Sequence, residues 1–303
     1  MPEGRLDTAE PPTVSVVLPV HNGAGTIREC VASLLAQRYP RDRYEVIVVD
    51  NGSTDTTLAS LVEFGSQIRL LEESRRGAGA ARNRGIRDAA GAVIAFIDAD
   101  ATADPDWLGA LVGASGDSAV GAAGGRILSR RPCNRIELFG EVIHDQQAAV
   151  RSDPPYLATG SWASRRDVLA CVGLFDESLL RGQDADLAWR IHQAGYQLVY
   201  QPEAVVYHRN ERTVLGLCRE GFTHGIAAVQ VRSRHLTPMS GRVRLRSRVG
   251  QRLLHQVVGL ARATDRVEAV LRIVFDAGKL AGELVALGRV SRGDPTASPE
   301  NGA

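Results

Sequence analysis

Residues 93–100 read Val-Ile-Ala-Phe-Ile-Asp-Ala-Asp, five apolar residues that run directly into two carboxylates separated by one alanine. A short apolar run of this kind is typical of a buried strand, and the acidic residues predict that the strand opens into a loop. Residues i and i+2 of an extended chain point the same way, so Asp98 and Asp100 are expected to share one face. This stretch decides the fold, because it predicts one strand of a buried sheet with functional groups at the strand's end.

Two interpretations fit this pair of carboxylates. In the first, Asp98 and Asp100 end the strand and start a turn, a frequent use of aspartate. In the second, they hold Mg2+ or Mn2+, which proteins usually bind through one or two carboxylates while substrate phosphates complete the coordination shell. The second interpretation makes a nucleotide diphosphate the natural companion ligand.

The composition is that of an ordinary globular enzyme. The chain has 303 residues, of which 44% are hydrophobic and 23% are charged, enough for one large or two small domains. The formal net charge of +1 gives no general reason to expect nucleic acid as a partner. The four cysteines form no C-x-x-C motif, and residues 1–12 are polar and lack the apolar core of an export signal. We therefore expect a cytoplasmic protein that begins with a disordered tail at residues 1–12.

Short apolar runs alternate with helical patterns through the first half of the chain, which predicts an α/β fold with a mostly parallel sheet flanked by helices. The expected strands are Val14–Val20, Glu45–Val49, Ile68–Glu72, Val93–Asp98 and Ala119–Gly124. The expected helices are Asp55–Phe64, Ala78–Ala89, Asp106–Ala114 and a segment whose apolar stripe is Ile27, Val31, Leu34 and Leu35.

The turns after the first two strands are rich in groups that can bond a nucleotide. Ligands of such sheets gather outside the carboxyl ends of the strands, where the chain has residues 21–23 and 50–55. The Asp50 carboxylate is suited to accept hydrogen bonds from a base or ribose, whereas Asp55 fits ordinary helix capping. Arg82, on the helix expected at residues 78–89, either pairs with a diphosphate or is a solvated surface residue.

In these motifs and their order the chain resembles the family 2 glycosyltransferases, which have the GT-A fold. The resemblance covers about residues 14–208. Each motif alone is only modestly specific, but their occurrence together in the family's order is specific. The matching segments are Val16–Asn22, Val48–Asp55, Gly79–Gly85, Phe96–Asp100, Gly160-Ser161, Arg165-Arg166, Val172–Glu177, Gly182–Arg190, Ala194–Tyr196 and Val205–His208.

The resemblance implies a nucleotide-sugar site with a divalent cation, Mn2+ or Mg2+. Asp50 would contact the base, and Asp98 the ribose or the second shell of the metal. Asp100 would bind the metal on the diphosphate, and His208 would complete the metal or diphosphate site. The residues implied to contact the nucleotide sugar are Pro19, Asn22, Asp50, Arg82, Asp98 and Ala99.

The resemblance also implies that Asp184 is the general base of an inverting, single-displacement transfer. An ionised carboxylate must lie within hydrogen-bond reach of the attacking hydroxyl. The family's usual Glu-Asp pair is Gln183-Asp184 here, and the loss of a neighbouring like charge should lower the pKa of Asp184 relative to that pair. Asp186 is the alternative base, although residues i and i+2 of a helix do not face the same way.

The acceptor site is expected in residues 126–210, with Gly160 and Trp162 as contacts and Trp162 stacking on a sugar. Trp189 is expected in the core of the domain. The segment Leu128–Tyr156 departs from the alternating pattern, and we expect it to form part of the acceptor site, with mobility that matters for function. The acceptor itself is left open as a glycan, a lipid-linked molecule or a small molecule.

Beyond His208 a helical extension is expected over residues 211–290, followed by a disordered tail at 291–303. Residues 232–255 form a basic stretch without acidic residues, and amphipathic helical periodicity follows it. Two interpretations fit: peripheral contact with an anionic inner membrane face, and packing on the catalytic domain or on a second subunit as a homodimer. Charges interrupt the apolar positions, so no transmembrane helix is expected.

The sequence therefore predicts a GT-A catalytic domain at 13–210, with its nucleotide-sugar part at about 13–125. Its function would be metal-dependent transfer of one sugar from a nucleotide diphosphate sugar to a hydroxyl, in cell-surface glycan, glycoconjugate or metabolite biosynthesis. The alternative is a catalytically silent binding subunit of a polysaccharide-assembly complex. A sugar nucleotidyltransferase is disfavoured because no basic glycine-rich loop follows the first strand, and an NAD-type oxidoreductase because the G-x-G-x-x-G fingerprint at 77–85 is incomplete.

Overall fold

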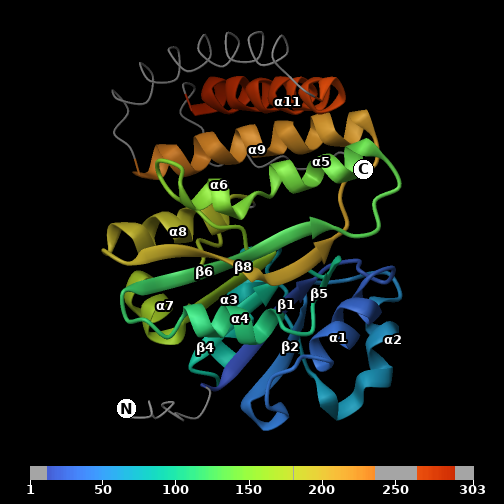
Figure 1. Ribbon diagram of the computed structural model, residues 1–303, viewed down its shortest axis with the longest axis vertical. Helices are drawn as coiled ribbons and strands as arrows, with labels where there is room; N and C mark the ends of the chain where they lie inside the picture. Colours follow the sequence, from blue (N-terminus) through green and yellow to red (C-terminus); the bar gives the residue numbers. More distant parts are fainter. Residues whose placement is uncertain (1–11, 180, 236–264, 291–303) are drawn as a thin grey trace, which may run out of the picture.

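The computed structural model describes residues 12–179, 181–235 and 265–290 and shows a twisted sheet flanked by helices (Figure 1). In these residues the sheet has eight strands in the order β3-β2-β1-β4-β7-β6-β8-β5. The strands are β1 (Val14–Val20), β2 (Tyr44–Asp50), β3 (Arg69–Glu72), β4 (Val93–Ile97), β5 (Ala101–Ala103), β6 (Val120–Ser129), β7 (Ser161–Arg165) and β8 (Gln197–His208).

The first half of the sheet is parallel, as the sequence predicts. β1 pairs with β2 on one side and with β4 on the other, and β2 pairs with β3, all in parallel. Every residue of β1 and of β4 is buried, because helices cover both faces of this part of the sheet. The carboxyl ends of β1, β2 and β4 therefore meet at one edge of the sheet.

The second half of the sheet is mixed. β7 lies between β4 and β6 and is antiparallel to both, while β8 is parallel to β6 and antiparallel to β5. In the β5–β8 pair, Ala101 lies opposite His208. This register brings a residue from the end of β8 beside the turn that follows β4.

Two layers of helices cover the sheet. One core lies between the sheet and α1 (Ile27–Leu35) and α4 (Trp107–Ala114). The other lies between the sheet and α3 (Ala78–Asp88), α7 (Arg166–Val172) and α8 (Gln183–Gln193). The helix expected over Asp55–Phe64 is α2 (Thr57–Leu61) followed by a 3-10 segment (Val62–Gln67), which is interrupted at Gly65 with φ of 47°. A further 3-10 turn spans Arg41–Arg43.

The segment Leu128–Tyr156 contains more regular structure than its sequence pattern indicates. β6 extends into it as far as Ser129, five residues beyond the expected end of that strand. Two helices follow, α5 (Arg135–Ile143) and α6 (Gln146–Val150), capped by the side chains of Asn134 and Asp145. Both helices lie between the sheet and the C-terminal helices (Figure 1).

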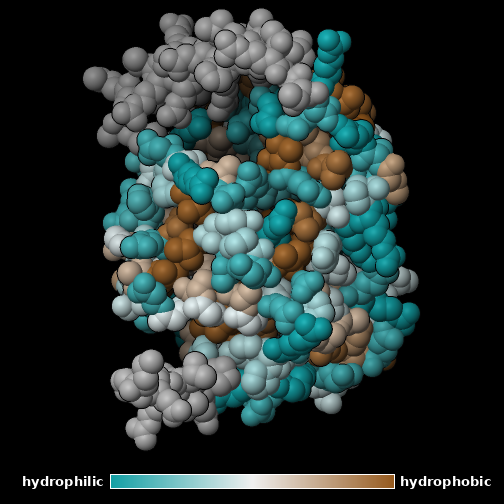
Figure 2. Space-filling model, viewed as in Figure 1, coloured by the Kyte–Doolittle hydropathy of each residue, from teal (hydrophilic) through white to brown (hydrophobic). Residues whose placement is uncertain are grey.

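The described residues after β8 are largely helical, as expected, and include α9 (Val214–His235) and α11 (Arg266–Val290). Gly221 of α9 meets Phe275, and four residues later Gly225 meets Lys279, so the two helices run parallel. None of the helices in the described part of the chain combines the length and the apolar character needed to cross a membrane. The face shown in Figure 2 carries its hydrophobic residues in several separate patches among hydrophilic ones.

Candidate active site

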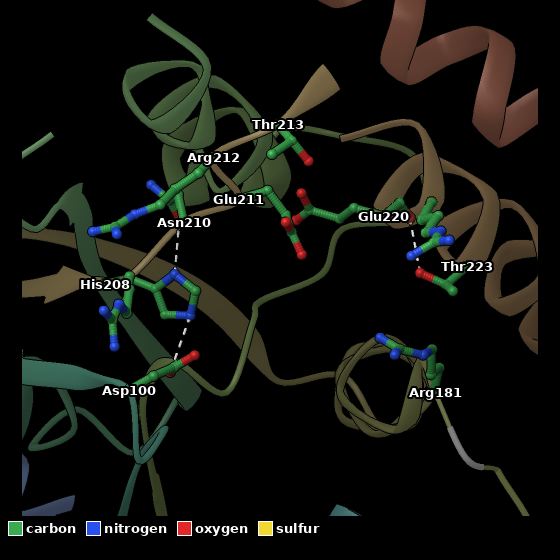
Figure 3. A pocket seen from close by; sticks show the side chains of 11 residues that line it. Asp100, Arg181, His208, Asn210, Glu211, Arg212, Thr213, Glu220 and Thr223 are labelled. Atoms are coloured by element: carbon green, nitrogen blue, oxygen red, sulfur yellow. Dashed lines mark hydrogen bonds and ion pairs between the residues drawn. The ribbon is translucent and has the colours of Figure 1, made fainter. Parts of the chain in front are cut away.

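Asp100 and His208 lie side by side at the edge of the sheet (Figure 3). Asp100 is in the turn between β4 and β5, and His208 is the last residue of β8. The β5–β8 pairing brings them together, and Asp100 Oδ1 lies 3.2 Å from His208 Nε2. The Asp100 side chain is 44% exposed and that of His208 is 18% exposed, so the pair is reachable from solvent.

The two side chains influence each other's charge. Burial alone would lower the pKa of His208, but the hydrogen bond to Asp100 and its negative charge raise that pKa to about 9. Burial would likewise raise the pKa of Asp100, but His208 holds it below its usual value. Asp100 Oδ1 and His208 Nε2, 3.2 Å apart, are close enough to ligate one divalent ion at bonds of about 2.0 to 2.2 Å. This pair of side chains therefore fits a metal site.

Asp98 has a different hydrogen-bond partner from Asp100, although its negative charge also raises the pKa of His208. The expectation that the two carboxylates share a face stays a prediction. The chain turns directly after β4, where the Ala101 N–H donates to the Asp98 main-chain oxygen at 3.1 Å. Asp98 Oδ1 accepts a hydrogen bond from Arg82 Nη2 at 2.9 Å, and the Arg82 side chain is only 7% exposed. Gly160 lies against the same carboxylate, since a Cβ there would be 3.3 Å from Asp98 Oδ2.

Asp184 lies near this Arg82–Asp98 pair, in the first turn of α8. Burial raises the pKa of Asp184, while the positive charge of Arg82 lowers it and the negative charge of Asp98 raises it. The neighbouring Gln183 is buried against Gly79 and donates through Nε2 to the main-chain oxygen of Leu179 at 2.6 Å. Gln183 therefore adds no charge beside Asp184.

Asp186 does not share the environment of Asp184. It is buried, its Oδ2 accepts hydrogen bonds from Arg190, and its Oδ1 lies 2.8 Å from His235 Nε2. Its partners are thus structural groups on α8 and α9. The expectation that only one of the two aspartates faces the site agrees with this arrangement.

The carboxyl ends of β1 and β2 form the other part of the site. Asp50 is 3% exposed, and its Oδ2 accepts from the main-chain N–H groups of Gly52 and Ser53, both at 3.1 Å. Its Oδ1 is buried and has no hydrogen-bond partner. An unpaired buried carboxylate oxygen is costly unless a ligand supplies a donor.

Neighbouring residues hold these two turns in place. Pro19 is buried in β1 opposite Val49, and Asn22 has a left-handed backbone (φ 52°) while its Oδ1 accepts from the Thr54 N–H at 2.8 Å. Asp55 accepts from the Thr57 N–H at 3.0 Å in a turn directly before α2, whose N-cap residue is Thr56 and not Asp55. Ala99 is partly buried against the core below α1.

Trp162 is placed differently from the expectation that it stacks on an acceptor sugar. Its side chain is 0% exposed, and it lies on β7 inside the core formed with α7 and α8. A fully buried ring offers no face to a sugar, so the stacking role is wrong. Trp189 is buried, as expected, and its ring stacks on that of His235 with centroids 4.7 Å apart.

Several residues near the site carry no signal in the sequence. A cavity of about 620 Å³ opens beside Asp100 and His208, and the N-terminal half of α9 forms its far wall (Figure 3). The other residues lining it are Arg181, Arg209, Asn210, Glu211, Arg212, Thr213, Arg219, Glu220 and Thr223. Burial and the charge of Glu211 raise the pKa of Glu220 to about 7. These residues lie in no recognised motif: residues 209–213 follow the end of β8, Arg181 precedes α8, and the packing of α9 brings Arg219, Glu220 and Thr223 to the cavity.

Comparisons with known proteins agree with this geometry. The model of the family described as Glycosyl transferase family 2 matches residues 15–173, which include Asp50, Arg82, Asp98, Asp100 and Gly160. The glycosyltransferase AglE of Haloferax volcanii is 32% identical over 230 residues, covering 74% of this chain and 75% of that protein. The pre-mycofactocin glycosyltransferase of Mycobacterium tuberculosis is 34% identical over 227 residues, covering 71% of this chain and 47% of that protein. The chain thus spans about half the length of the second relative.

Solved structures show the same fold. A mannosyltransferase of Pyrobaculum calidifontis, solved in complex with GDP-Man and Mn2+, superposes with a TM-score of 0.65 at 22% identity, covering 91% of this chain and 87% of that one. GalNAc-T7, solved with UDP, GalNAc and Mn2+, has a TM-score of 0.53 at 20% identity, covering 67% of this chain and 44% of that one. The sheet, the matched motifs and these relatives lead to one conclusion. The chain is a glycosyltransferase of family 2 with the GT-A fold.

Proposed function

We propose that this glycosyltransferase transfers one sugar from a nucleotide diphosphate sugar to an acceptor hydroxyl, with inversion at the anomeric carbon and with the help of a divalent cation. The observation that carries the proposal is the convergence of Asp100 and His208, 3.2 Å apart, beside the Arg82–Asp98 pair. Asp184, whose charge couples to both Arg82 and Asp98, completes the set.

The nucleotide would lie over the carboxyl ends of β1 and β2. The unpaired Asp50 Oδ1 is available to a donor on the base, because the carboxylate is already held in place by its other oxygen. Asn22 and Pro19 shape the neighbouring turn, and Ala99 borders the turn between β4 and β5. Asp98 would bind the ribose or the second shell of the metal.

Asp100 and His208 would hold Mn2+ or Mg2+ on the diphosphate. A carboxylate and an imidazole suit Mn2+ well, and such ions keep water or substrate oxygens in their remaining positions. When bound, the cation would stabilise negative charge on the departing nucleotide diphosphate. The solved complex of the Pyrobaculum calidifontis mannosyltransferase with GDP-Man and Mn2+ supports this assignment by similarity of fold.

Asp184 would act as the general base. It would accept the proton of the acceptor hydroxyl as that oxygen bonds to the anomeric carbon and the bond from this carbon to the diphosphate oxygen breaks. One displacement at one carbon gives inversion. Burial, which raises the pKa of Asp184, makes it a stronger base than an exposed aspartate. The single positive charge of the buried Arg82 would offset part of the negative charge of Asp98 and Asp184 before the reaction.

The acceptor would approach from the side of Gly160 and Tyr156, whose side chain is 39% exposed and whose pKa is raised by its partial burial and by the charge of Asp184. Gly160 packs closely beside Asp98, since a Cβ there would lie 3.3 Å from Asp98 Oδ2, and we propose it as an acceptor contact next to this carboxylate. We further propose a single addition to a glycan, lipid-linked or small-molecule acceptor.

Calorimetric titration tests the core of the proposal. UDP, GDP and dTDP are each titrated with and without Mn2+ into the wild type, Asp100→Ala and the control Asp106→Ala. Asp106 is an exposed acid at the start of α4 that pairs with Arg38. We expect one nucleotide to bind more tightly with Mn2+, and this gain to be lost in Asp100→Ala and kept in Asp106→Ala. Equal binding with and without Mn2+ in the wild type would contradict metal use.

A further inference from the structure

Asn210 joins three parts of the fold at the metal-binding end of the site. It lies two residues beyond His208, and its side-chain Oδ1 is 2.8 Å from His208 Nδ1 (Figure 3). On its other side, Nδ2 donates to Ser129 Oγ at the end of β6 and to the main-chain oxygen of Glu137 in α5, both at 3.0 Å. One carboxamide thus connects the histidine to β6 and to α5.

These contacts determine which end of the amide faces the histidine. The main-chain oxygen of Glu137 can only accept, so it must face the NH2 group of Asn210. The carbonyl oxygen of the amide therefore faces His208. Because that oxygen also only accepts, His208 Nδ1 must carry a hydrogen. The tautomer of the ring is thus assigned from its bonding partners.

The tautomer has a direct consequence for metal binding. With its hydrogen on Nδ1, a neutral His208 has its lone pair on Nε2, the nitrogen that lies 3.2 Å from Asp100 Oδ1. The opposite tautomer would put a hydrogen on Nε2 and remove the lone pair that a metal needs. Metal-binding histidines generally donate their second N–H to such a partner, which also fixes the orientation of the ring.

The surroundings leave the Asn210 side chain little freedom. Ser129 and Glu137 are both buried, and Ser129 Oγ donates to the same Glu137 oxygen at 2.9 Å. A Cβ at Gly140 would lie 2.1 Å from Asn210 Nδ2, so the absence of a side chain there lets the amide pack directly on α5. The segment between β6 and α6 therefore holds the amide in one place.

We propose that Asn210 is a positioning residue for the metal site, which holds His208 as the Nδ1–H tautomer with Nε2 directed beside Asp100. This inference rests on the proposed function, and in particular on a divalent cation at Asp100 and His208. It gives the segment containing α5 a role in metal binding in addition to the acceptor role predicted for it. Partners of this kind typically contribute about 10- to 100-fold to metal affinity.

The test compares Asn210→Leu with Asn210→Asp. Leucine has nearly the same shape but makes no hydrogen bonds, whereas aspartate keeps an acceptor for His208 Nδ1–H and loses both donated bonds. Mn2+ is titrated calorimetrically in the presence of the nucleotide diphosphate that the wild type binds, and thermal stability is measured in parallel. We expect about 10- to 100-fold weaker Mn2+ binding in Asn210→Leu, and binding within about threefold of wild type in Asn210→Asp.

Asp145→Ala is the matched control. Asp145 caps the neighbouring helix α6 by accepting from the N–H group of Ala148, whereas Asn210 bonds to α5 and β6. We expect lower thermal stability and an unchanged Kd for Mn2+ in this variant. If Asn210→Leu does not fold, Ser129→Ala replaces it, because this change removes one acceptor of the Asn210 amide and should weaken Mn2+ binding severalfold.

Two results would overturn the proposal. One is wild-type affinity for Mn2+ in Asn210→Leu, or in Ser129→Ala where that variant replaces it. The other is an equal loss of affinity in Asn210→Leu and Asn210→Asp. The second result would mean that Asn210 only stabilises the fold. A wild type that binds the nucleotide without any dependence on Mn2+ would instead contradict the proposed metal site itself, so the two failures are distinguishable.

Discussion

The proposed role of Asp184 as general base predicts how the reaction rate depends on pH. As the base, its carboxylate must be ionised to accept a proton, and burial raises its pKa. The rate should therefore fall as the pH drops through that raised pKa. Gln183→Glu restores the Glu-Asp pair usual in the family and adds a like charge next to Asp184, so we expect the acidic limb of the kcat/KM profile to move to higher pH.

The profile is measured with the donor nucleotide sugar once it is identified, with Asp184→Asn as the control. Removing a general base typically costs about 10²- to 10⁴-fold in rate, and the residual activity of Asp184→Asn should have no acidic limb from this group. The buried Gln183 donates to the Leu179 oxygen, so Gln183→Glu should also lower the stability by about 1 to 3 kcal/mol. A limb that stays in place would show that another group is the base.

At the same scale, the sequence did not predict all the positions of the candidate side chains. Asp98 and Asp100 are adjacent in the motif, yet one binds Arg82 on α3 and the other binds His208 on β8. The backbone turns after Asp98 instead of continuing as an extended strand, and the two side chains have different partners. The position of Trp162 was not predictable for a similar reason. The sequence around it does not reveal that β7 is a central strand, on which the Trp162 side chain lies in a closed core.

At the scale of elements, the strands of the parallel half of the sheet and the first part of β6 were predictable, whereas β5, β7 and β8 were not. β1, β2 and β4 are continuous apolar runs with helices between them. β5 has three residues, β7 contains two serines and an arginine, and β8 contains Pro202 and a register shift, so each lacks the usual pattern. Their pairing is a long-range property of the chain, and it is what brings His208 to Asp100.

The contact between α8 and α9 gives a prediction at this scale. His235, at the end of α9, stacks on Trp189 and bonds to Asp186, two residues after the proposed base. His235→Ala should lower the free energy of unfolding by about 1 to 3 kcal/mol, because Asp186 loses a hydrogen bond and the Trp189 ring loses its stacking partner. Chemical denaturation measures this loss. Ser233→Ala is the control, since its exposed hydroxyl bonds only within α9.

Substrate kinetics show whether this contact also supports the site. We expect His235→Ala to reduce kcat more than it raises KM for the donor, because α8 carries the proposed base Asp184, whereas the proposed nucleotide site lies over β1 and β2. Unchanged stability and unchanged kcat would mean that the α8–α9 contact is incidental.

At the scale of the whole molecule, α9 and α11 form an added layer that reaches the catalytic domain. α9 lines the cavity beside Asp100 through Arg219, Glu220 and Thr223, and its far end is tied to the domain by Arg234 and His235. These last two residues belong to the basic stretch at 232–255, for which membrane contact was one of two interpretations, and both are engaged within the chain. Residues 236–255 of that stretch lie outside the described residues, so contact with an anionic membrane stays a prediction.

The α9–α11 layer depends on glycines that let the two helices approach closely. A Cβ at Gly225 would lie 2.0 Å from the Lys279 main-chain oxygen, whereas one at Gly288, on α11, would meet nothing within 4 Å. Gly225→Ala should therefore separate the helices and lower the free energy of unfolding by about 1 to 3 kcal/mol or more. Gly288→Ala should leave it unchanged or raise it by up to about 1 kcal/mol, because alanine favours the helix. Thermal unfolding of both variants measures the difference. Equal stability of the two variants would show that the close packing of α9 on α11 does not contribute to the free energy of unfolding. Because α9 also lines the cavity beside Asp100, we expect Gly225→Ala to weaken substrate binding as well.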